Sequence, residues 1–168
     1  MIIENLIREN IKSLKPYSSA REEFKNSASN LVYLDANENP FDTGLNRYPD
    51  PQQNLVKAAL AKIKNVSREQ LLLGNGSDEV LDLIFRVFCE PKVDTVIVLP
   101  PTYGMYEVLA NTNDVGLIKI SLLDNYQPNV DEILKAQNSQ TKLLFLCSPN
   151  NPTANSFNAD KIETLIKK

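Results

Sequence analysis

Three short segments of the sequence combine residue types that bind small anions and planar ligands. They are Gly74–Glu79, Pro100–Tyr106 and Cys147–Thr153, and each follows an apolar run short enough to be a buried strand. In an open parallel sheet, ligands bind at the carboxyl ends of the strands. The three segments therefore predict one binding site along one edge of a sheet.

The segment Gly74–Glu79 has the composition of an anion-binding loop. Its two glycines let the backbone approach a ligand, and the free amides in the first turn of the following helix suit a phosphate. Alternatively, Ser77 only caps that helix, with Asp78 and Glu79 complementing the helix dipole. The segment matches neither the Walker lysine pattern nor a full dinucleotide fingerprint, so both interpretations stay open.

The other two segments offer a ring and an amide. Tyr103, stiffened by two preceding prolines, is placed to stack on a planar heteroaromatic ligand, although Tyr103 and Tyr106 could instead be core residues of a helix. Between Pro149 and Pro152, an asparagine amide could be held rigidly toward a ligand, or the segment could be a plain turn. A phosphate cradle, a stacking ring and a fixed amide together describe a site for a phosphorylated aromatic cofactor such as pyridoxal phosphate.

Composition bounds the remaining possibilities. The chain has 168 residues, 42% hydrophobic and 23% charged, as expected for one soluble globular domain. Its net charge of −3, with both signs scattered, argues against a nucleic-acid or anionic-membrane surface. It has no histidine, the commonest general base and metal ligand, and we expect Cys89 and Cys147 to be buried thiols rather than a disulfide or a metal pair. The N-terminus does not have the pattern of a signal peptide, and no apolar run could span a bilayer, which predicts a cytoplasmic protein.

Helical and strand patterns alternate along the chain. Expected helices cover residues 3–14, 50–63, 80–88, 102–110, 130–136 and the stretch from 158, with Asp50, Ser67 and Asn129 as caps; expected strands cover 31–34, 71–73, 95–99, 116–122 and 142–147. This alternation predicts a three-layer αβα fold with a largely parallel sheet. We expect residues 1–30 to form an N-terminal helical arm and linker, and residues 31–168 to form a partial, incomplete large domain. The apolar face of the arm would lie on its own domain or, as we prefer, on a partner subunit.

The same residues also resemble a known family. The segments that match are Leu14–Tyr17, Leu34–Pro40, Asn46–Pro49, Gly74–Glu79, Phe88–Pro91, Pro100–Tyr106 and Cys147–Thr153. In this order and spacing the chain resembles the N-terminal half of histidinol-phosphate aminotransferases, which are fold-type I pyridoxal-phosphate enzymes. The resemblance implies transfer of an amino group between histidinol phosphate and glutamate, through 2-oxoglutarate, in histidine biosynthesis.

The resemblance also implies roles for individual residues. Backbone amides of Gly76, Ser77 and Asp78 would hold the cofactor phosphate, Tyr103 would stack on the pyridine ring, and Asn151 would hydrogen-bond the 3-oxygen of that ring. Tyr48 would reach the phosphate of the neighbouring subunit in a homodimer, and Tyr17 would lie near the substrate.

Two departures from the family pattern matter. Ala154 stands where the family has glycine, and because alanine avoids positive φ we expect the loop to leave at a different angle. The Schiff-base lysine, the aspartate that pairs with the pyridine nitrogen and the arginine that binds the substrate carboxylate lie in the family's second half, outside this chain. We therefore expect weak cofactor binding and no catalysis by the chain alone. Another aminotransferase subfamily, a non-catalytic remnant and a plain phosphate-binding module are the alternatives.

Overall fold

A computed structural model describes residues 3–18 and 32–168 of the chain. They divide into two compact units, one made of Met1–Leu14 with Gly74–Lys168 and the other of Lys15–Leu73. The elements are η1 (Ile3–Leu6), α1 (Glu9–Lys12), α3 (Asn54–Lys64), η2 (Arg68–Gln70), α4 (Ser77–Phe88), β1 (Thr95–Val98), α5 (Met105–Thr112), β2 (Gly116–Lys119), α6 (Val130–Ala136), β3 (Thr141–Leu144) and α7 (Ala159–Ile166). Within the described residues, no helix is long and apolar enough to cross a membrane.

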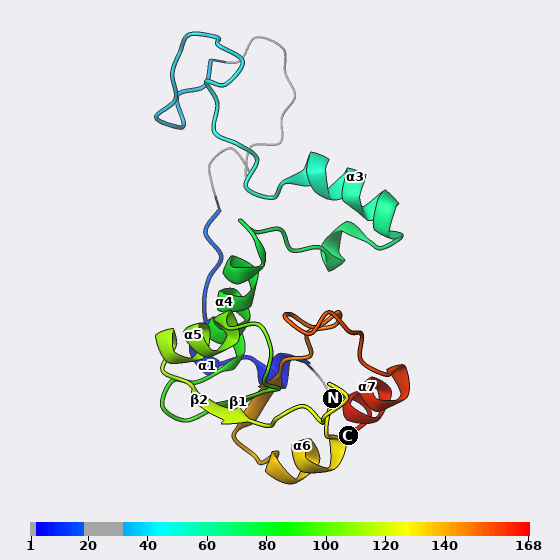
Figure 1. Cartoon of the computed structure of the whole chain (residues 1–168). Helices are drawn as coiled ribbons and strands as arrows, with labels where there is room; N and C mark the ends of the chain where they lie inside the picture. The colour runs from blue at the N-terminus through cyan, green and yellow to red at the C-terminus, as the bar shows by residue number, and fades with distance from the viewer. Residues whose placement is uncertain (1–2, 19–31) are drawn as a thin grey trace. The chain divides into compact units, whose positions relative to one another are not determined.

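The first unit is built on a parallel sheet with strand order β2-β1-β3 (Figure 1). β1 pairs with β2 from Thr95 opposite Gly116 to Val98 opposite Lys119, and with β3 up to Ile97 opposite Leu144. The chain passes from β1 to one neighbour and then crosses to the other side of β1. This reversal makes β1 the switch point of the sheet, where a crevice forms at the carboxyl ends.

Each face of the sheet has its own core, because successive side chains of β1 point in opposite directions. Val96 and Val98 pack in a cluster with buried residues of α4 and α5, whereas Ile97 and Leu99 pack with Ile133 of α6 and apolar residues of α7. Helices therefore cover both faces. The predicted αβα layers and parallel sheet are confirmed for this part of the chain.

Two helices of this unit, α6 and α7, begin at asparagines whose side chains cap the helix. The Asn129 side chain accepts a hydrogen bond from the amide of Glu132, and the Asn158 side chain accepts from the amides of Asp160 and Lys161. These caps satisfy amides that have no acceptor inside the helix. The cap predicted at Asn129 is confirmed.

The N-terminal residues of the first unit differ from the single helix expected over residues 3–14. They form the short 3₁₀ turn η1 and the single turn α1. The segment is anchored to its own unit: Arg8 donates through Nε to Glu90 Oε2 at 3.0 Å and through Nη1 to the carbonyl of Arg86 at 2.9 Å. The Arg8 guanidinium holds the pKa of the Glu90 carboxyl below its usual value through this hydrogen bond.

The second unit contains little regular structure apart from α3 and η2. Residues 32–34 and 71–73 form no strand, and Val32 and Leu34 are exposed, so both strand predictions for these described residues are wrong; Leu31 lies outside the described residues. A β-compatible sequence becomes a strand only where a partner supplies the ladder of hydrogen bonds. The capping box predicted at Ser67 is present at the start of η2.

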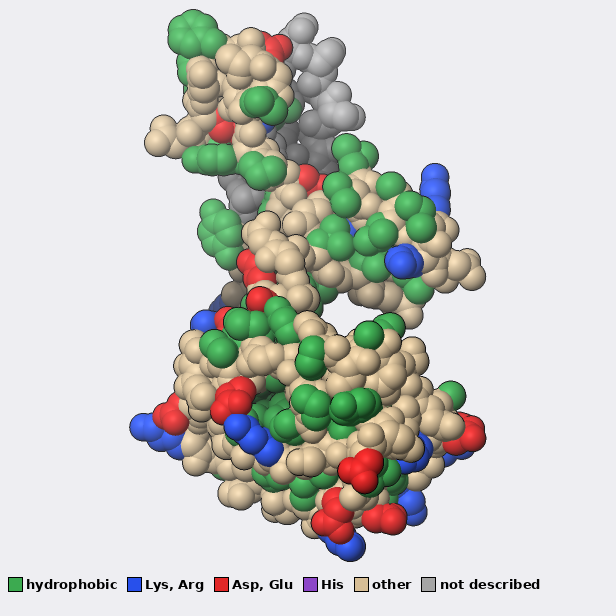
Figure 2. All heavy atoms as spheres, in the orientation of Figure 1, with side chains coloured by type: hydrophobic (Ala, Val, Ile, Leu, Met, Phe, Trp, Pro, Cys, Tyr) green, Lys and Arg blue, Asp and Glu red, His purple; other side chains and the backbone are tan. Residues whose placement is uncertain are grey.

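Helix α3 begins later than the sequence predicts. Gln53 has a left-handed backbone with φ of +54°, so the helix starts at Asn54, and Asp50 instead accepts hydrogen bonds from the amides of Gln52 and Asn54. Apolar side chains gather over this helix in the space-filling view (Figure 2), with Leu55 and Ile63 strongly exposed.

Candidate functional site

The loops after β1 and β3 meet at the carboxyl edge of the sheet. We call residues 99–104 the β1 loop and residues 145–158 the β3 loop. The buried side chain of Asn150 joins them, since it accepts a hydrogen bond from the Thr102 hydroxyl at 3.0 Å and donates one to the Pro101 carbonyl at 2.9 Å. Two of the three segments singled out in the sequence are thereby in direct contact.

The third segment, Gly74–Glu79, leads into α4. Gly76 has φ of +79° and ψ of 174°, a conformation that favours glycine, and its amide donates to the Gly74 carbonyl at 3.0 Å. Gly76 occupies the N-cap position and Ser77 is the first helical residue, so the interpretation of Ser77 as a side-chain cap is wrong. The amides of Ser77 and Asp78 lie in the first turn, where a helix provides no acceptor for them.

Tyr103 links this helix start to the β1 loop. Its hydroxyl donates to the carboxylate of Asp78, 3.0 Å from Oδ1 and 3.3 Å from Oδ2. The hydrogen bond to Asp78 raises the pKa of Tyr103 above its ordinary value, with burial as a smaller cause. Asp78 therefore turns its charge toward Tyr103, and the ring lies beside the first turn of α4.

The two tyrosines that the sequence left ambiguous have different roles. Tyr106 is buried in the core, stacked on Phe145 with ring centroids 4.6 Å apart, and burial raises its pKa. Tyr103 is only half buried and meets Tyr106 edge-on, with centroids 5.6 Å apart. The structure thus leaves Tyr103, and not Tyr106, at the edge where a ligand could bind.

Asn151 has an exposed side chain, next to the buried Asn150. The end of the segment differs from the prediction. Ala154 has φ of +58°, so the loop keeps the left-handed conformation that a glycine would adopt, and the expected change of exit angle is wrong. Two backbone hydrogen bonds of 2.8 Å enforce this conformation, from Ala154 to the Asn150 carbonyl and from Asn150 to the Asn155 carbonyl.

The remaining predicted site residues, Tyr17 and Tyr48, belong to the second unit. Tyr17 is 90% exposed. Tyr48 is held by Glu38, whose carboxylate accepts from the Tyr48 amide at 2.8 Å and from the Arg47 guanidinium at 2.8 Å. The two sequence segments around residues 38 and 47 therefore form one hydrogen-bonded structure, with the Tyr48 ring largely exposed.

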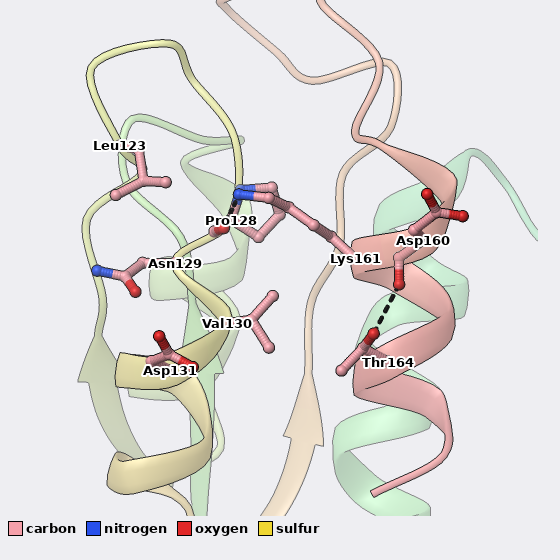
Figure 3. Close-up of a pocket in the computed structure, with 8 residues that line it drawn as sticks. All are labelled: Leu123, Pro128, Asn129, Val130, Asp131, Asp160, Lys161 and Thr164. Atoms are coloured by element: carbon pink, nitrogen blue, oxygen red, sulfur yellow. Dashed lines mark hydrogen bonds between the residues drawn. The ribbon is translucent and has the colours of Figure 1, made fainter.

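The structure also contains an open groove of about 370 Å³, at the N-terminal ends of α6 and α7 (Figure 3). Lys161 extends across it and donates to the Pro128 carbonyl at 2.9 Å. None of the predicted site residues lines this groove. The Lys161 side chain is half buried there.

The two cysteines of the chain are free thiols that differ in burial. Cys89 is a buried free thiol, as the sequence predicts, and burial raises its pKa to about 12. Cys147 is also free but only partly buried. Within the described ranges, no three histidine, cysteine, aspartate or glutamate side chains cluster as metal ligands do.

Comparison with known proteins identifies the family. The model of the family "Aminotransferase class I and II" matches residues 25–168. The chain belongs to this family. It is similar to the histidinol-phosphate aminotransferase of Flavobacterium psychrophilum, with 61% identity over 98% of the chain and 48% of that relative, and to that of Bacteroides thetaiotaomicron, with 51% identity over 99% of the chain and 48% of that relative. The chain thus spans about half the length of these curated relatives.

A solved structure supports the same fold. The histidinol-phosphate aminotransferase of Sinorhizobium meliloti, solved in complex with pyridoxal-5'-phosphate, matches 72% of this chain and 33% of its own with a TM-score of 0.65 and 22% identity. At that identity the match establishes the fold alone. The predicted incomplete large domain of a fold-type I enzyme agrees with this partial coverage.

One residue of this edge was missed by the sequence reasoning. Asn150, 3% exposed, makes the contacts that join the two loops. The sequence contains the signal, two asparagines between two prolines, but only the fold determines which amide faces inward.

Proposed function

We propose that this chain forms the pyridoxal-phosphate-binding part of an aminotransferase of the histidinol-phosphate type. The observation that carries the proposal is the convergence of the first turn of α4, the Tyr103 ring and the β3 loop at the carboxyl edge of one parallel sheet. Phosphate, ring and hydroxyl are the three groups of the cofactor that such an edge would recognise. The proteins with which the chain shares most of its length support the reaction type.

The residues present fit this cofactor. A Cβ built on Gly76 would meet no atom within 4 Å, so space remains at the helix start for an anion. The free amides there and the positive end of the helix dipole favour a phosphate, and the exposed Ser77 hydroxyl adds a donor. We assign phosphate binding to the amides of Gly76, Ser77 and Asp78. The Gly76 amide would then donate to the phosphate in place of the Gly74 carbonyl.

The other two residues would orient the ring. Tyr103 would pack its face on the pyridine, with its hydroxyl fixed by Asp78, and the exposed Asn151 amide would donate to the ring's 3-oxygen. When bound, pyridoxal phosphate supplies an electron sink for reactions at the amino-bearing carbon of the substrate. The contribution of this chain is to bind and orient that group at a rigid edge.

We further propose the reaction and assembly of the whole protein. It would move an amino group between histidinol phosphate and 2-oxoglutarate in the cytoplasm, within histidine biosynthesis. Tyr17 would lie near the substrate, and the exposed Tyr48 ring would reach the phosphate bound by the partner subunit of a homodimer. Sedimentation of the chain over a range of concentrations tests the dimer, because a dimer that uses Tyr48 should weaken in Tyr48→Ala.

The 168 residues alone should bind the cofactor weakly and should not transaminate. Two of the three lysines that follow the β3 loop have other partners: Lys161 donates to the Pro128 carbonyl and Lys167 pairs with Glu163 at 2.5 Å. Catalytic groups would have to come from residues outside this chain.

The test is titration of the chain with pyridoxal phosphate, followed by borohydride reduction and intact-mass measurement. We expect saturable binding that protects against thermal unfolding, and no stoichiometric adduct on one lysine. A single adduct on one mapped lysine would refute the proposal that this chain lacks a reactive lysine. Equal stabilisation by inorganic phosphate and pyridoxal phosphate would refute ring recognition and favour a plain phosphate-binding module.

A further inference from the structure

Both the oxygen and the nitrogen of the Asn150 side-chain amide are hydrogen-bonded within the protein. Its Oδ1 accepts from the Thr102 hydroxyl at 3.0 Å, and its Nδ2 donates to the Pro101 carbonyl at 2.9 Å and to Thr153 Oγ1 at 2.7 Å. Both N–H donors of the amide are therefore used, and the residue is only 3% exposed, so Asn150 has no N–H left to donate to a ligand. Asn150 is therefore a buried neighbour of the site and has no donor to offer to the 3-oxygen of the cofactor ring.

The hydrogen bonds continue beyond Asn150 in one direction. The Thr153 hydroxyl donates to Asn155 Oδ1 at 2.5 Å, so it can only accept from Asn150, and Asn155 Nδ2 donates to the carbonyl of Tyr126 at 3.0 Å. A hydroxyl has a single hydrogen, which fixes this polarity. We call the side chains of Thr102, Asn150, Thr153 and Asn155 the loop clamp. It ties the β1 loop, the β3 loop and the segment after β2 together.

We propose that Asn150 is the positioning residue of this site: through the loop clamp it fixes the β1 and β3 loops in one register, so that Asn151 and Tyr103 are preorganised for an aromatic ligand. Asn151 follows Asn150 directly and is exposed, and Tyr103 follows Thr102 directly. Fixing both neighbours before a ligand arrives lowers the entropy cost of binding. The identity of the ligand rests on the proposed function; the clamp itself does not.

The chemistry of the clamp requires asparagine at this position. Asn150→Asp keeps the shape but replaces two donors by an oxygen facing the Pro101 carbonyl and Thr153 Oγ1, both of which are acceptors in the clamp. Buried acceptors that face one another without a hydrogen are destabilising. Thr102→Val removes the donor to Oδ1 while keeping the side-chain shape, and Thr102→Ser restores the donor.

Hydrogen–deuterium exchange on the complete 168-residue chain tests the clamp without any ligand. In Asn150→Asp and Thr102→Val, the amides of Asn150 and Ala154 should exchange about tenfold faster or more, as expected for loss of one hydrogen bond. The amides of β1 should stay as protected as in the wild type. Thr102→Ser and the matched control Asn151→Asp should leave both regions unchanged.

Ligand binding supplies a second readout that general loosening of the fold would not give. Asn150→Asp should weaken binding of pyridoxal phosphate about tenfold but leave inorganic phosphate unchanged, because the clamp does not touch the first turn of α4. Unchanged loop exchange in Asn150→Asp would overturn the inference, as would equal loss of both ligands. Failure of the wild-type chain to bind pyridoxal phosphate would instead overturn the proposed function, and exchange would still decide the clamp.

Discussion

Replacing Ala154 by glycine should stabilise the protein, although glycine usually destabilises. Ala154 is exposed and has φ of +58°, a left-handed conformation enforced by the hydrogen bonds that the backbone amides of Asn150 and Ala154 donate. For an L-residue with a Cβ, this conformation costs about 1–2 kcal/mol relative to glycine. Glycine also raises the entropy of the unfolded chain, which lowers the free energy of unfolding by about 0.4–1 kcal/mol. The net expectation for Ala154→Gly is stabilisation by about 1 kcal/mol.

Urea unfolding followed by far-ultraviolet circular dichroism measures this difference. The matched control is Ala159→Gly, also an exposed alanine, at the first position of α7. Its right-handed conformation is open to alanine, so glycine there should destabilise by about 0.4–1 kcal/mol through the larger entropy of the unfolded chain. The two substitutions should therefore shift the unfolding midpoint in opposite directions. If both variants lose stability equally, the left-handed strain at Ala154 does not exist and the reasoning is refuted.

Three further predictions concern the site and its support. Gly76→Ala should lower the free energy of unfolding by about 1–3 kcal/mol in the same assay, because φ of +79° with ψ of 174° is nearly confined to glycine. The control Gly104→Ala, at φ of −64°, should not destabilise, and equal effects of the two substitutions would contradict the prediction. Asp78→Asn should lower the pKa of Tyr103, read from tyrosinate absorbance, since the hydrogen bond to the carboxylate that raises this pKa is lost together with the carboxylate charge; an unchanged titration would exclude the contact. The hydrogen bond from Asn113, together with Arg86, holds the pKa of Asp82 below its ordinary value of 3.8. The ionised Asp82 therefore stabilises the fold above pH 3.8, and this stabilisation is lost as the pH falls through the lowered pKa. Asp82→Asn should destabilise the protein at neutral pH and have no effect in strong acid; a loss of stability that does not depend on pH would contradict this.

The sequence predicts those parts of the fold whose signals are local. Amphipathic periodicity located α4 and α6, and the polar cap at Asn129 marked a helix start to the residue. The three strands of the sheet were located within a few residues, because each is a short β-branched or leucine-rich run bounded by turn residues. In these segments propensity and burial agree, which is why local pattern sufficed.

The errors arise where distant residues decide. Residues 32–34 have the pattern of a strand but no partner strand. Helix α3 begins later than expected because Gln53 adopts a left-handed backbone conformation. Ala154 is held in a conformation that its own chemistry disfavours, by hydrogen bonds that only the folded loop provides. The inward turn of Asn150 rather than Asn151 depends likewise on Thr102, which lies 48 residues away in the chain.

The placement of β1 has a consequence for the order of events during synthesis. β1 is the first strand to be made but the central one in the sheet, so it must wait for both neighbours. A nascent chain that has emerged only through β2 presents one unpaired edge of β1, an open template for other strands. That edge is filled, and the Thr102–Asn150 contact can close, only after β3 and its loop have left the ribosome. Among the three described strands, the binding edge is thus completed last, and a slow step in translation between β2 and β3 would prolong the exposure of the unpaired edge of β1.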